Sequence, residues 1–297
     1  MNMLILSDGR MGHLNQSLAL AHYLNASYCI VPVRFTCKLF KPLSYVLDFL
    51  KIYTPLLFKL ENPLPQSFEM IVGAGSNTYY AAKTLAQYYH VKSVTMMLPK
   101  GYRFDFDYIF AQSHDHPPKQ ENIIKIPANV SFTKPQGLFV PRSKSIGIII
   151  GGNNAHFTMD KERLKAQLET IFEQFQGYEI AVTTSPRTSK EIETLLENYP
   201  FSYSVIFSRN KINPIADFLH HCEVVFITMD STSMMSEAIS YGNSYVEILP
   251  LNGDTLTKFY KMAHSLEEKK YAHIFNGSVA YYGNKIDFKE LIQKAIT

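Results

Sequence analysis

The chain has few cysteines, no long apolar run and ordinary amounts of glycine and proline, and each of these shortages excludes a class of protein. Its 297 residues include only three cysteines, Cys29, Cys37 and Cys222, and no two have CxxC spacing. This number and spacing indicate neither a disulfide framework nor a zinc site. No apolar run approaches the roughly 18 residues that a membrane-spanning helix needs. The 14 glycines and 15 prolines follow no period, so collagen-like and low-complexity sequences are excluded too.

Charge is also scarce and nearly balanced. Charged residues make up 19% of the chain, and the net charge of +3 is too small to indicate nucleic-acid binding. Hydrophobic residues make up 46%, which excludes a disordered chain. The first eight residues run directly into a segment typical of a strand, with no basic stretch and no cleavage-site pattern. We therefore expect a cytoplasmic globular protein.

One segment, Arg34–Leu60, departs from this balance. It holds five basic residues against one acid, Asp48, and is rich in Leu, Phe and Tyr. Such a segment can bind anionic lipid headgroups while its apolar side chains enter the membrane interface. A pair of core helices with a solvated basic face would have the same composition.

Short apolar segments alternate with stretches of helical spacing along most of the chain, which predicts a doubly wound α/β fold. The expected strands of the first half are 3–6, 29–33, 70–72, 93–97, 108–111 and 123–126. Those of the second half are 145–150, 178–183, 204–207, 224–228 and 245–248. Helices are expected at 12–24 and after Gly75, and then at 161–175, 190–198, 215–220 and 233–240.

Between Pro127 and Lys144 this alternation stops in a polar stretch punctuated by proline and glycine, which we interpret as a linker. The pattern predicts a Rossmann-like N-terminal domain at 1–140 and a second at 141–285. A last helix at 286–297 would cross back to the first domain. Two such domains facing a central cleft form the GT-B architecture, in which ligands bind at the carboxyl ends of the strands.

Two loops of the first half carry candidate functional residues. The loop Ser7–Gln16 opens a helix and contains Gly12, Asp8 and His13. Its glycines can expose backbone N–H groups, and the acid and the imidazole can transfer protons. A simple Asp/Gly turn with an exposed histidine would explain the same residues. In the loop Gly73–Asn77, either a ligand lies close to the glycines or Ser76 or Asn77 caps the next helix.

Two further loops lie in the second half. In Gly151–Phe157, paired glycines would leave room for a phosphate or sugar that the two asparagines bind, although a tight turn also explains the glycines. In Thr183–Thr188, the spacing of Thr188 and Glu191 predicts a capping box. Arg187 would then bind a diphosphate next to the helix N-terminus, or would be a solvated loop charge.

The loop after the strand 224–228 is the most informative. Asp230, Ser231, Thr232 and Ser233 form a cluster of small polar residues at the start of a helix, where N–H groups and hydroxyls can bind a diphosphate. Glu237 follows about one and a half turns later, where its carboxylate could accept both ribose hydroxyls of a nucleotide. The helix dipole alone also favours an acid near this end.

Taken in order, these loops resemble one family, the bacterial relatives of the plant mitochondrial-fission "elongated mitochondria" proteins. That family is GT-B-like and is often described as a predicted nucleoside-diphosphate-sugar epimerase. Its patterns Asp-Gly-x-x-Gly-His-x-Asn-Gln, Gly-Gly-x-x-x-His-Phe, Thr-Thr-Ser-x-Arg-Thr and Asp-Ser-x-Ser-Met-x-Ser-Glu-Ala match residues 8–16, 151–157, 183–188 and 230–238. A further match runs from Phe106-Asp107-Tyr108 to His114-Asp115-x-Pro117-Pro118.

The loops and the resemblance together imply a GT-B-type glycosyltransferase with a nucleotide-sugar donor, acting in bacterial cell-envelope glycan or glycolipid synthesis. The second domain would bind the donor, with Glu237 on the ribose, Ser231–Ser233 and Arg187 on the diphosphate, and Gly151 and Gly152 near the sugar or β-phosphate. The other residues expected on the donor side are Asn153, His156, Thr184, Ser185 and Asp230.

The first domain would bind the acceptor and supply the general base. The residues expected on the acceptor side are Gly12, Asn15, Gln16, Gly75 and Ser76. Asp8 and His13 are the candidate bases, with His114 and Asp115 in reserve. No metal and no other cofactor is expected, because arginine and helix N-termini can stabilise a departing diphosphate.

Two alternatives remain open. A nucleoside-diphosphate-sugar epimerase would use the same scaffold without an acceptor. A non-enzymatic membrane-surface adaptor would match the role of the plant relatives in recruiting a fission factor. Through Arg34–Leu60 the protein would meet a lipid-linked or membrane-surface acceptor, as a peripheral protein on the cytoplasmic face of the inner membrane.

Overall fold

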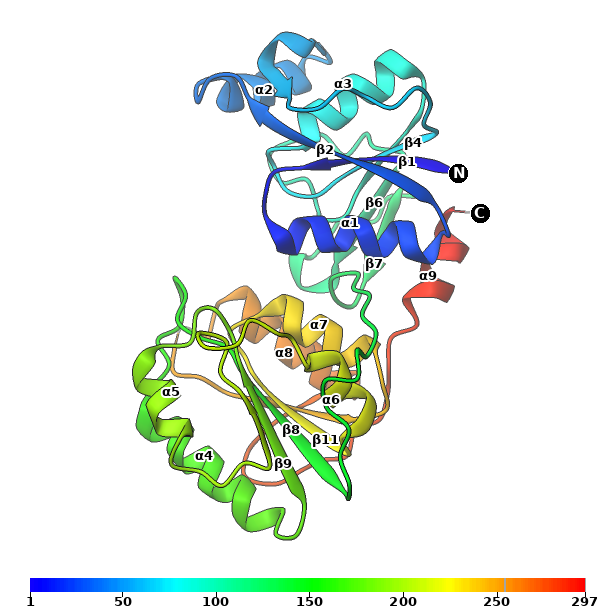
Figure 1. Cartoon of the computed structure of the whole chain (residues 1–297). Coiled ribbons are helices and arrows are strands. Elements are labelled where there is room, and N and C mark those ends of the chain that lie inside the picture. Colours follow the sequence, from blue (N-terminus) through cyan, green and yellow to red (C-terminus); the bar gives the residue numbers. More distant parts are fainter. Residues whose placement is uncertain (254, 297) are drawn as a thin grey trace. The chain divides into compact units, whose positions relative to one another are not determined.

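The computed structural model describes residues 1–253 and 255–296, and the chain forms two compact units (Figure 1). The first unit consists of Met1–Phe132 together with the C-terminal segment from Asp287, and the second consists of Thr133–Ile286. Within the described residues, no helix is long and apolar enough to span a membrane.

The first unit is built on a seven-stranded sheet in the order β3-β2-β1-β4-β5-β6-β7. All neighbours are parallel except β2 and β3, which are antiparallel. The strands are β1 (Asn2–Ser7), β2 (Ser27–Phe35), β3 (Phe58–Leu60), β4 (Met70–Gly73), β5 (Lys92–Thr95), β6 (Tyr108–Gln112) and β7 (Ile123–Ile126).

Helices cover both faces of this sheet. The α-helices are α1 (Met11–Tyr23), α2 (Phe40–Phe49), α3 (Tyr79–Tyr89) and α9 (Phe288–Ile296), and two short 3-10 helices are η1 (Pro55–Leu57) and η2 (Ser113–Asp115). Figure 1 shows α1 on one face of the sheet, with α9 beside it, and α2 and α3 on the other. The C-terminal helix α9 therefore belongs to the first unit, where Phe288 packs near Tyr23 of α1.

The second unit contains a fully parallel six-stranded sheet in the order β10-β9-β8-β11-β12-β13. Its strands are β8 (Ser145–Ile150), β9 (Glu179–Thr184), β10 (Tyr203–Val205), β11 (Val224–Thr228), β12 (Tyr245–Leu249) and β13 (His273–Ile274). Its helices are α4 (Lys161–Gln174), α5 (Lys190–Leu196), α6 (Ile215–His221), α7 (Thr232–Ser240) and α8 (Lys258–Glu268).

The central strands are buried along almost their whole length, because helices pack on both faces of each sheet. All six residues of β8 and all five of β11 are buried. This explains their uniformly apolar, β-branched sequences. In each unit the strand order reverses once, between β1 and β4 and between β8 and β11. Such reversals open a crevice at the carboxyl ends of the strands, so the loops after these four strands are the first places to look for a ligand site.

The boundary between the units lies earlier than the predicted 140/141. Thr133 already belongs to the second unit, and the reason is the buried Asp217 of α6. Its carboxylate accepts hydrogen bonds from the backbone N–H groups of Gln136, Gly137 and Leu138, the shortest at 2.7 Å. Phe139 then packs edge-on against Phe218. The predicted linker is thus anchored to the second unit. The short strands β3 and β13 were not predicted.

Candidate functional site

In the second unit, three of the predicted loops lie side by side. They follow β8, β9 and β11, which are neighbours in the sheet, so their carboxyl ends share one edge. Asp230 joins all three loops. Its side chain is fully buried and accepts hydrogen bonds from the Thr228 hydroxyl at 2.7 Å and from the Gly152 N–H at 3.0 Å. A buried carboxylate requires partners of this kind.

Arg187 supplies the positive charge for this carboxylate. Its Nη2 lies 2.7 Å from Asp230 Oδ2, and its side chain is 39% exposed. From the sequence, Arg187 would bind a diphosphate or be a solvated loop charge. In the structure it pairs with an internal acid. The guanidinium carries five N–H donors, so this pair leaves further donors for a second anion.

The paired glycines are explained by the close approach of the loops. A Cβ at Gly151 would overlap the Asp230 carboxylate, and a Cβ at Gly152 would overlap the backbone carbonyl of Arg187. Asp230 and the Arg187 backbone fill the space that a Cβ would take, so loop packing explains both glycines. A phosphate or sugar next to this loop stays a prediction.

The two asparagines of the loop after β8 form hydrogen bonds that stabilise this loop. Asn154 donates to the Asp230 carbonyl at 3.0 Å and accepts from the N–H groups of His156 and Phe157. Asn153 accepts from the N–H of Met159 at 2.8 Å. These bonds give both amide side chains a role within the loop, and binding of a ligand by them stays a prediction. His156 is exposed and lies 5.7 Å from Phe259, measured between ring centroids.

The hydroxyls of the loop after β9 are also used locally. Thr184 accepts a hydrogen bond from the N–H of Phe207 at 2.8 Å, and Ser185 Oγ accepts from the N–H of Arg187 at 3.1 Å. Thr188 accepts from the N–H of Ser185. The predicted capping box at Thr188 is wrong, because Ser189 is the N-cap of α5 and accepts from the Ile192 N–H.

The loop after β11 keeps the character that the sequence predicts. Ser231 is the N-cap of α7 and accepts a hydrogen bond from the Met234 N–H at 3.3 Å. Thr232 is half-buried, Ser233 is exposed, and no acid lies in the first turn. The first N–H groups of a helix have no acceptor within it and carry the positive end of its dipole, so this terminus is suited to bind an anion.

Glu237 lies in the second turn of α7, about 7–8 Å along the helix axis from Thr232. Its side chain is half-buried. Burial raises the pKa of Glu237, and a hydrogen bond with the Thr133 side chain opposes that shift. Nothing in the sequence links Thr133 to Glu237, because the two residues are far apart in the chain and meet only in the folded structure.

In the first unit, the loops after β1 and β4 meet at the other reversal of strand order. His13 Nδ1 lies 3.1 Å from Asp8 Oδ2, and the Asp8 side chain is buried. A Cβ at Gly75 would overlap the His13 ring, and Gly75 has a φ of +86°, so glycine is required there on both counts. With Nδ1 on the carboxylate, His13 Nε2 is the ring atom able to take a proton.

Tyr79 connects this dyad to another predicted acid. Burial raises the pKa of Tyr79 to about 12, and the charges of Asp115 and Asp8 act on it in the same direction. Asp115 lies on η2 with His114 and pairs with Lys100 Nζ at 2.6 Å. The charges of Asp8 and Asp115 therefore both disfavour the ionised form of Tyr79. The sequence offered no signal for Tyr79.

The remaining acceptor-side residues are placed differently from the sequence interpretation. Lys41 of α2 donates to Ser76 Oγ at 2.9 Å and to Asn77 Oδ1 at 2.8 Å. Neither Ser76 nor Asn77 caps α3, whose N-cap position is Thr78. The Gln16 amide donates to the carbonyl of Gly12 and accepts from the buried Gln112. Asn15 lines a separate pocket of about 500 Å³ with His22 and Phe132.

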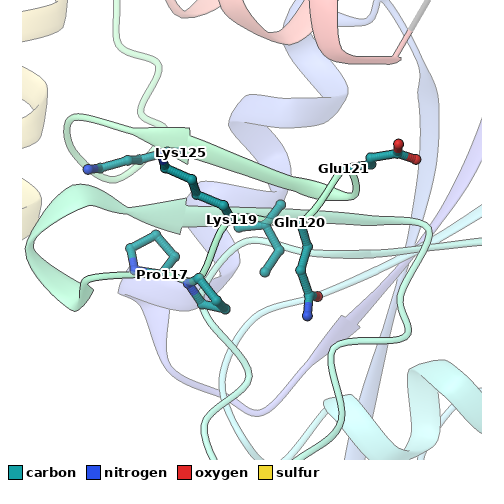
Figure 2. Close-up of a pocket in the computed structure, with 7 residues that line it drawn as sticks. Pro117, Lys119, Gln120, Glu121 and Lys125 are labelled. Atoms are coloured by element: carbon teal, nitrogen blue, oxygen red, sulfur yellow. The ribbon is translucent and has the colours of Figure 1, made fainter.

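Another pocket lies away from these loops. It measures about 530 Å³ and is lined only by residues of the β6–β7 connection and of β7, as Figure 2 shows. Its charged side chains are Lys119, Glu121 and Lys125, and no residue of the two strand-order reversals contributes to it. Among the residues that the structure describes, no three His, Cys, Asp or Glu side chains gather where they could hold a metal ion.

The profile of the family "Mitochondrial fission ELM1" matches residues 11–295. The chain belongs to this ELM1 family. The resemblance seen in the loop motifs is confirmed over nearly the whole sequence. This ELM1-family chain is 26% identical to the uncharacterized protein RP120 of Rickettsia prowazekii, over 94% of this chain and 92% of that one.

Solved structures confirm the GT-B-like fold. The glycosyltransferase SnogD of Streptomyces nogalater superposes with a TM-score of 0.52 and 11% identity, covering 99% of this chain and 94% of SnogD. UDP-GlcNAc 2-epimerase of Methanocaldococcus jannaschii superposes with a TM-score of 0.50 and 14% identity, covering 100% of this chain and 92% of that enzyme. The ELM1-family chain thus shares its fold with both classes of enzyme.

Proposed function

We propose that the chain is a glycosyltransferase that uses a nucleotide-sugar donor, and that the second unit binds the donor at the N-terminus of α7. The observation that carries this proposal is the arrangement at the reversal between β8 and β11. A helix terminus with three consecutive hydroxyl residues begins there, and Glu237 follows on the next turn. The helix terminus would bind a diphosphate, and Glu237 would bind a ribose that lies one helical turn away.

Each part of the donor has a partner in this proposal. The N–H groups and hydroxyls of Ser231–Ser233 bind the diphosphate, and Glu237 accepts the ribose hydroxyls. Arg187 approaches the diphosphate with the donors that Asp230 leaves. Asp230, Gly151 and Gly152 shape the site by holding the three loops together. The likeness of the fold to a UDP-GlcNAc 2-epimerase supports a uridine nucleotide as the first ligand to test.

The first unit supplies the base. The acceptor hydroxyl attacks the anomeric carbon of the donor sugar, its proton passes to His13 Nε2, and Asp8 stabilises the imidazolium that forms. The bond between the anomeric carbon and the diphosphate oxygen breaks, and the oxygen keeps the electron pair. The positive end of α7 and the Arg187 guanidinium stabilise the negative charge of the departing diphosphate.

A thermal-shift survey with UDP, GDP, ADP and CMP tests the donor site. We expect UDP or another nucleoside diphosphate to raise the melting temperature of the wild type and of Glu268→Gln, a control at an exposed acid on α8. Glu237→Ala should reduce or abolish the shift. The proposal fails if no nucleotide raises the melting temperature, or if Glu237→Ala responds as the wild type does.

An epimerase is the second candidate, because the fold matches a UDP-GlcNAc 2-epimerase as well as a glycosyltransferase. Epimerisation needs acids and bases near a bound donor but no acceptor. Incubation of UDP-sugars without an acceptor, followed by proton NMR, separates the two reactions. If an epimer accumulates, and if its rate of formation depends on His13, the chain is an epimerase and the proposal of a transferase fails.

A further inference from the structure

The helix α2 (Phe40–Phe49) of the first unit is amphipathic, but its polar face points into the protein. Ser44 and Asp48 are buried and Lys41 is half-buried, whereas Leu43, Val46 and Phe49 are exposed. In a water-exposed helix the apolar stripe faces the core. Phe40, Tyr45 and Leu47 of α2, which is labelled in Figure 1, do pack against the core, so the exposed stripe is a second apolar face of the helix.

Inward hydrogen bonds and ion pairs fix this orientation. Asp48 Oδ1 lies 2.6 Å from Lys83 Nζ of α3, and both side chains are buried. Asp48 Oδ2 accepts from the Arg103 N–H at 2.7 Å, and Ser44 Oγ lies 2.8 Å from the Tyr102 hydroxyl. Rotating α2 to bury its exposed apolar side chains would break the buried Asp48–Lys83 pair and leave Lys83 with Asp105 as its acidic partner, at a free-energy cost. The apolar face is therefore held outward.

The outward face continues beyond the helix. Seven large hydrophobic side chains between positions 39 and 56 are exposed, and Leu39, Phe49 and Leu56 are each at least 75% exposed. The exposed set, called here the α2 face, consists of Leu39, Leu43, Val46, Phe49, Leu50, Ile52 and Leu56. Leu39, Leu43, Val46 and Leu50 follow the i, i+4, i+7 spacing of one helix face, and an exposed apolar surface of this kind marks a contact with a partner or a membrane.

The exposed charges within the segment that carries the α2 face are of one sign. Between positions 36 and 60 the exposed charged side chains are Lys38, Lys51 and Lys59. The single acid of that range, Asp48, is buried and paired. A twofold contact between two α2 faces would bring these lysines close to their own copies, which disfavours a second copy of the chain as the occupant. An anionic lipid surface satisfies the lysines and the apolar side chains together.

We propose that the α2 face docks on an anionic lipid bilayer, with its apolar side chains in the interface and Lys38, Lys51 and Lys59 on the headgroups. The inward side of the same helix contacts the loop after β4, where Lys41 binds Ser76 and Asn77. Docking therefore brings the Gly75 loop and the adjacent His13 to the bilayer. If the proposed transferase activity holds, the acceptor is a lipid-linked molecule in that bilayer.

Co-sedimentation with phosphatidylcholine vesicles, with and without phosphatidylglycerol, tests the docking at low salt. We expect the wild type to sediment with anionic vesicles only. Leu43→Ser/Phe49→Ser should weaken binding by about thirtyfold, since each exposed apolar side chain contributes about 1 kcal/mol or more when it is buried. Lys38→Glu/Lys51→Glu should weaken it by a similar factor, from about 1 kcal/mol per lysine. Val140→Ser and Lys211→Glu, at exposed sites of the second unit, should bind as the wild type does.

The residues chosen are exposed, so circular dichroism and melting temperature should remain those of the wild type. Absence of sedimentation, or equal sedimentation with neutral vesicles, overturns the proposal. So does a dimer in light scattering that Leu43→Ser/Phe49→Ser dissociates while vesicle binding is unchanged. Thermal shifts with UDP on the same variants keep the two proposals separate. Docking without any nucleotide response would leave the bilayer contact in place and favour an adaptor over an enzyme.

Discussion

Arg187 donates to the Asp230 carboxylate across 2.7 Å, and this ion pair joins the loops after β9 and β11. The Gly152 N–H donates to the same carboxylate, so the loop after β8 is held as well. Three loops that carry recognisable motifs are thus organised around one buried charge. At the start of α7, Ser231 and Thr232 are half-buried and Ser233 is exposed, and these three residues remain the candidates for contact with a ligand.

Arg187→Ala should destabilise the second unit by about 2 kcal/mol, because it removes the cation from a fully buried carboxylate. Arg209→Ala is the matched control, since its partner Glu197 and Arg209 itself are both exposed, and such a pair contributes about 0–1 kcal/mol. Urea unfolding measures both changes. Equal losses in the two variants would contradict the structural role given to Asp230.

Gly152→Ala should destabilise the second unit by about 2–4 kcal/mol, because the added Cβ meets the backbone carbonyl of Arg187 and the backbone cannot move aside cheaply. Gly283→Ala provides the control, since its Cβ would meet only Tyr245 at an ordinary 3.4 Å. Thermal unfolding of the two variants side by side checks this. A Gly152→Ala variant as stable as Gly283→Ala would show that the loops lie further apart.

Donor affinity should fall as the pH is lowered, and the fall should begin at a higher pH than an ordinary glutamate would give. The reason is that burial raises the pKa of Glu237, whereas only its ionised form accepts two ribose hydroxyls. Calorimetric titration with a UDP-sugar, whose diphosphate does not titrate in this range, measures the effect. In Glu237→Gln the affinity should be weaker and independent of pH. A pH dependence that survives in Glu237→Gln would assign it to another group.

Asp48→Ala should destabilise the first unit by about 1–3 kcal/mol, because the buried Lys83 then keeps Asp105 but loses Asp48, and the Arg103 N–H loses its acceptor. Asp48→Leu/Lys83→Met removes both charges and should restore most of the loss. Urea unfolding of the single and double variants forms the required cycle. A double variant no better than Asp48→Ala would show that the pair does not set the orientation of α2.

The sequence predicts the alternation of strands and helices well, because strands buried on both faces are short, apolar and β-branched. It predicts the segment 145–150 exactly where β8 lies, for this reason. It cannot predict which polar groups pair across the fold. Asp217 binds the linker N–H groups and so moves the unit boundary, and nothing in the sequence joins those positions.

For the candidate site too, some features could be predicted from the sequence and others could not. The hydroxyl cluster at 231–233 was predicted from its position after an apolar strand, and it does begin α7. The packing roles of Gly151, Gly152 and Asn153 could not be predicted, because glycines and amides serve loop packing and ligand binding equally well until the neighbours are known. The exposed apolar face of α2 could have been suspected from the spacing of Leu39, Leu43, Val46 and Leu50, but periodicity does not tell which stripe faces the core.

A crystal structure of the chain soaked with UDP tests the donor site most directly. The account predicts a diphosphate against the N–H groups at the start of α7, beside Ser231–Ser233, with the ribose hydroxyls on the Glu237 carboxylate and the Arg187–Asp230 pair intact. A nucleotide bound anywhere else in the second unit, or a Glu237 carboxylate turned away from the ribose, would contradict it.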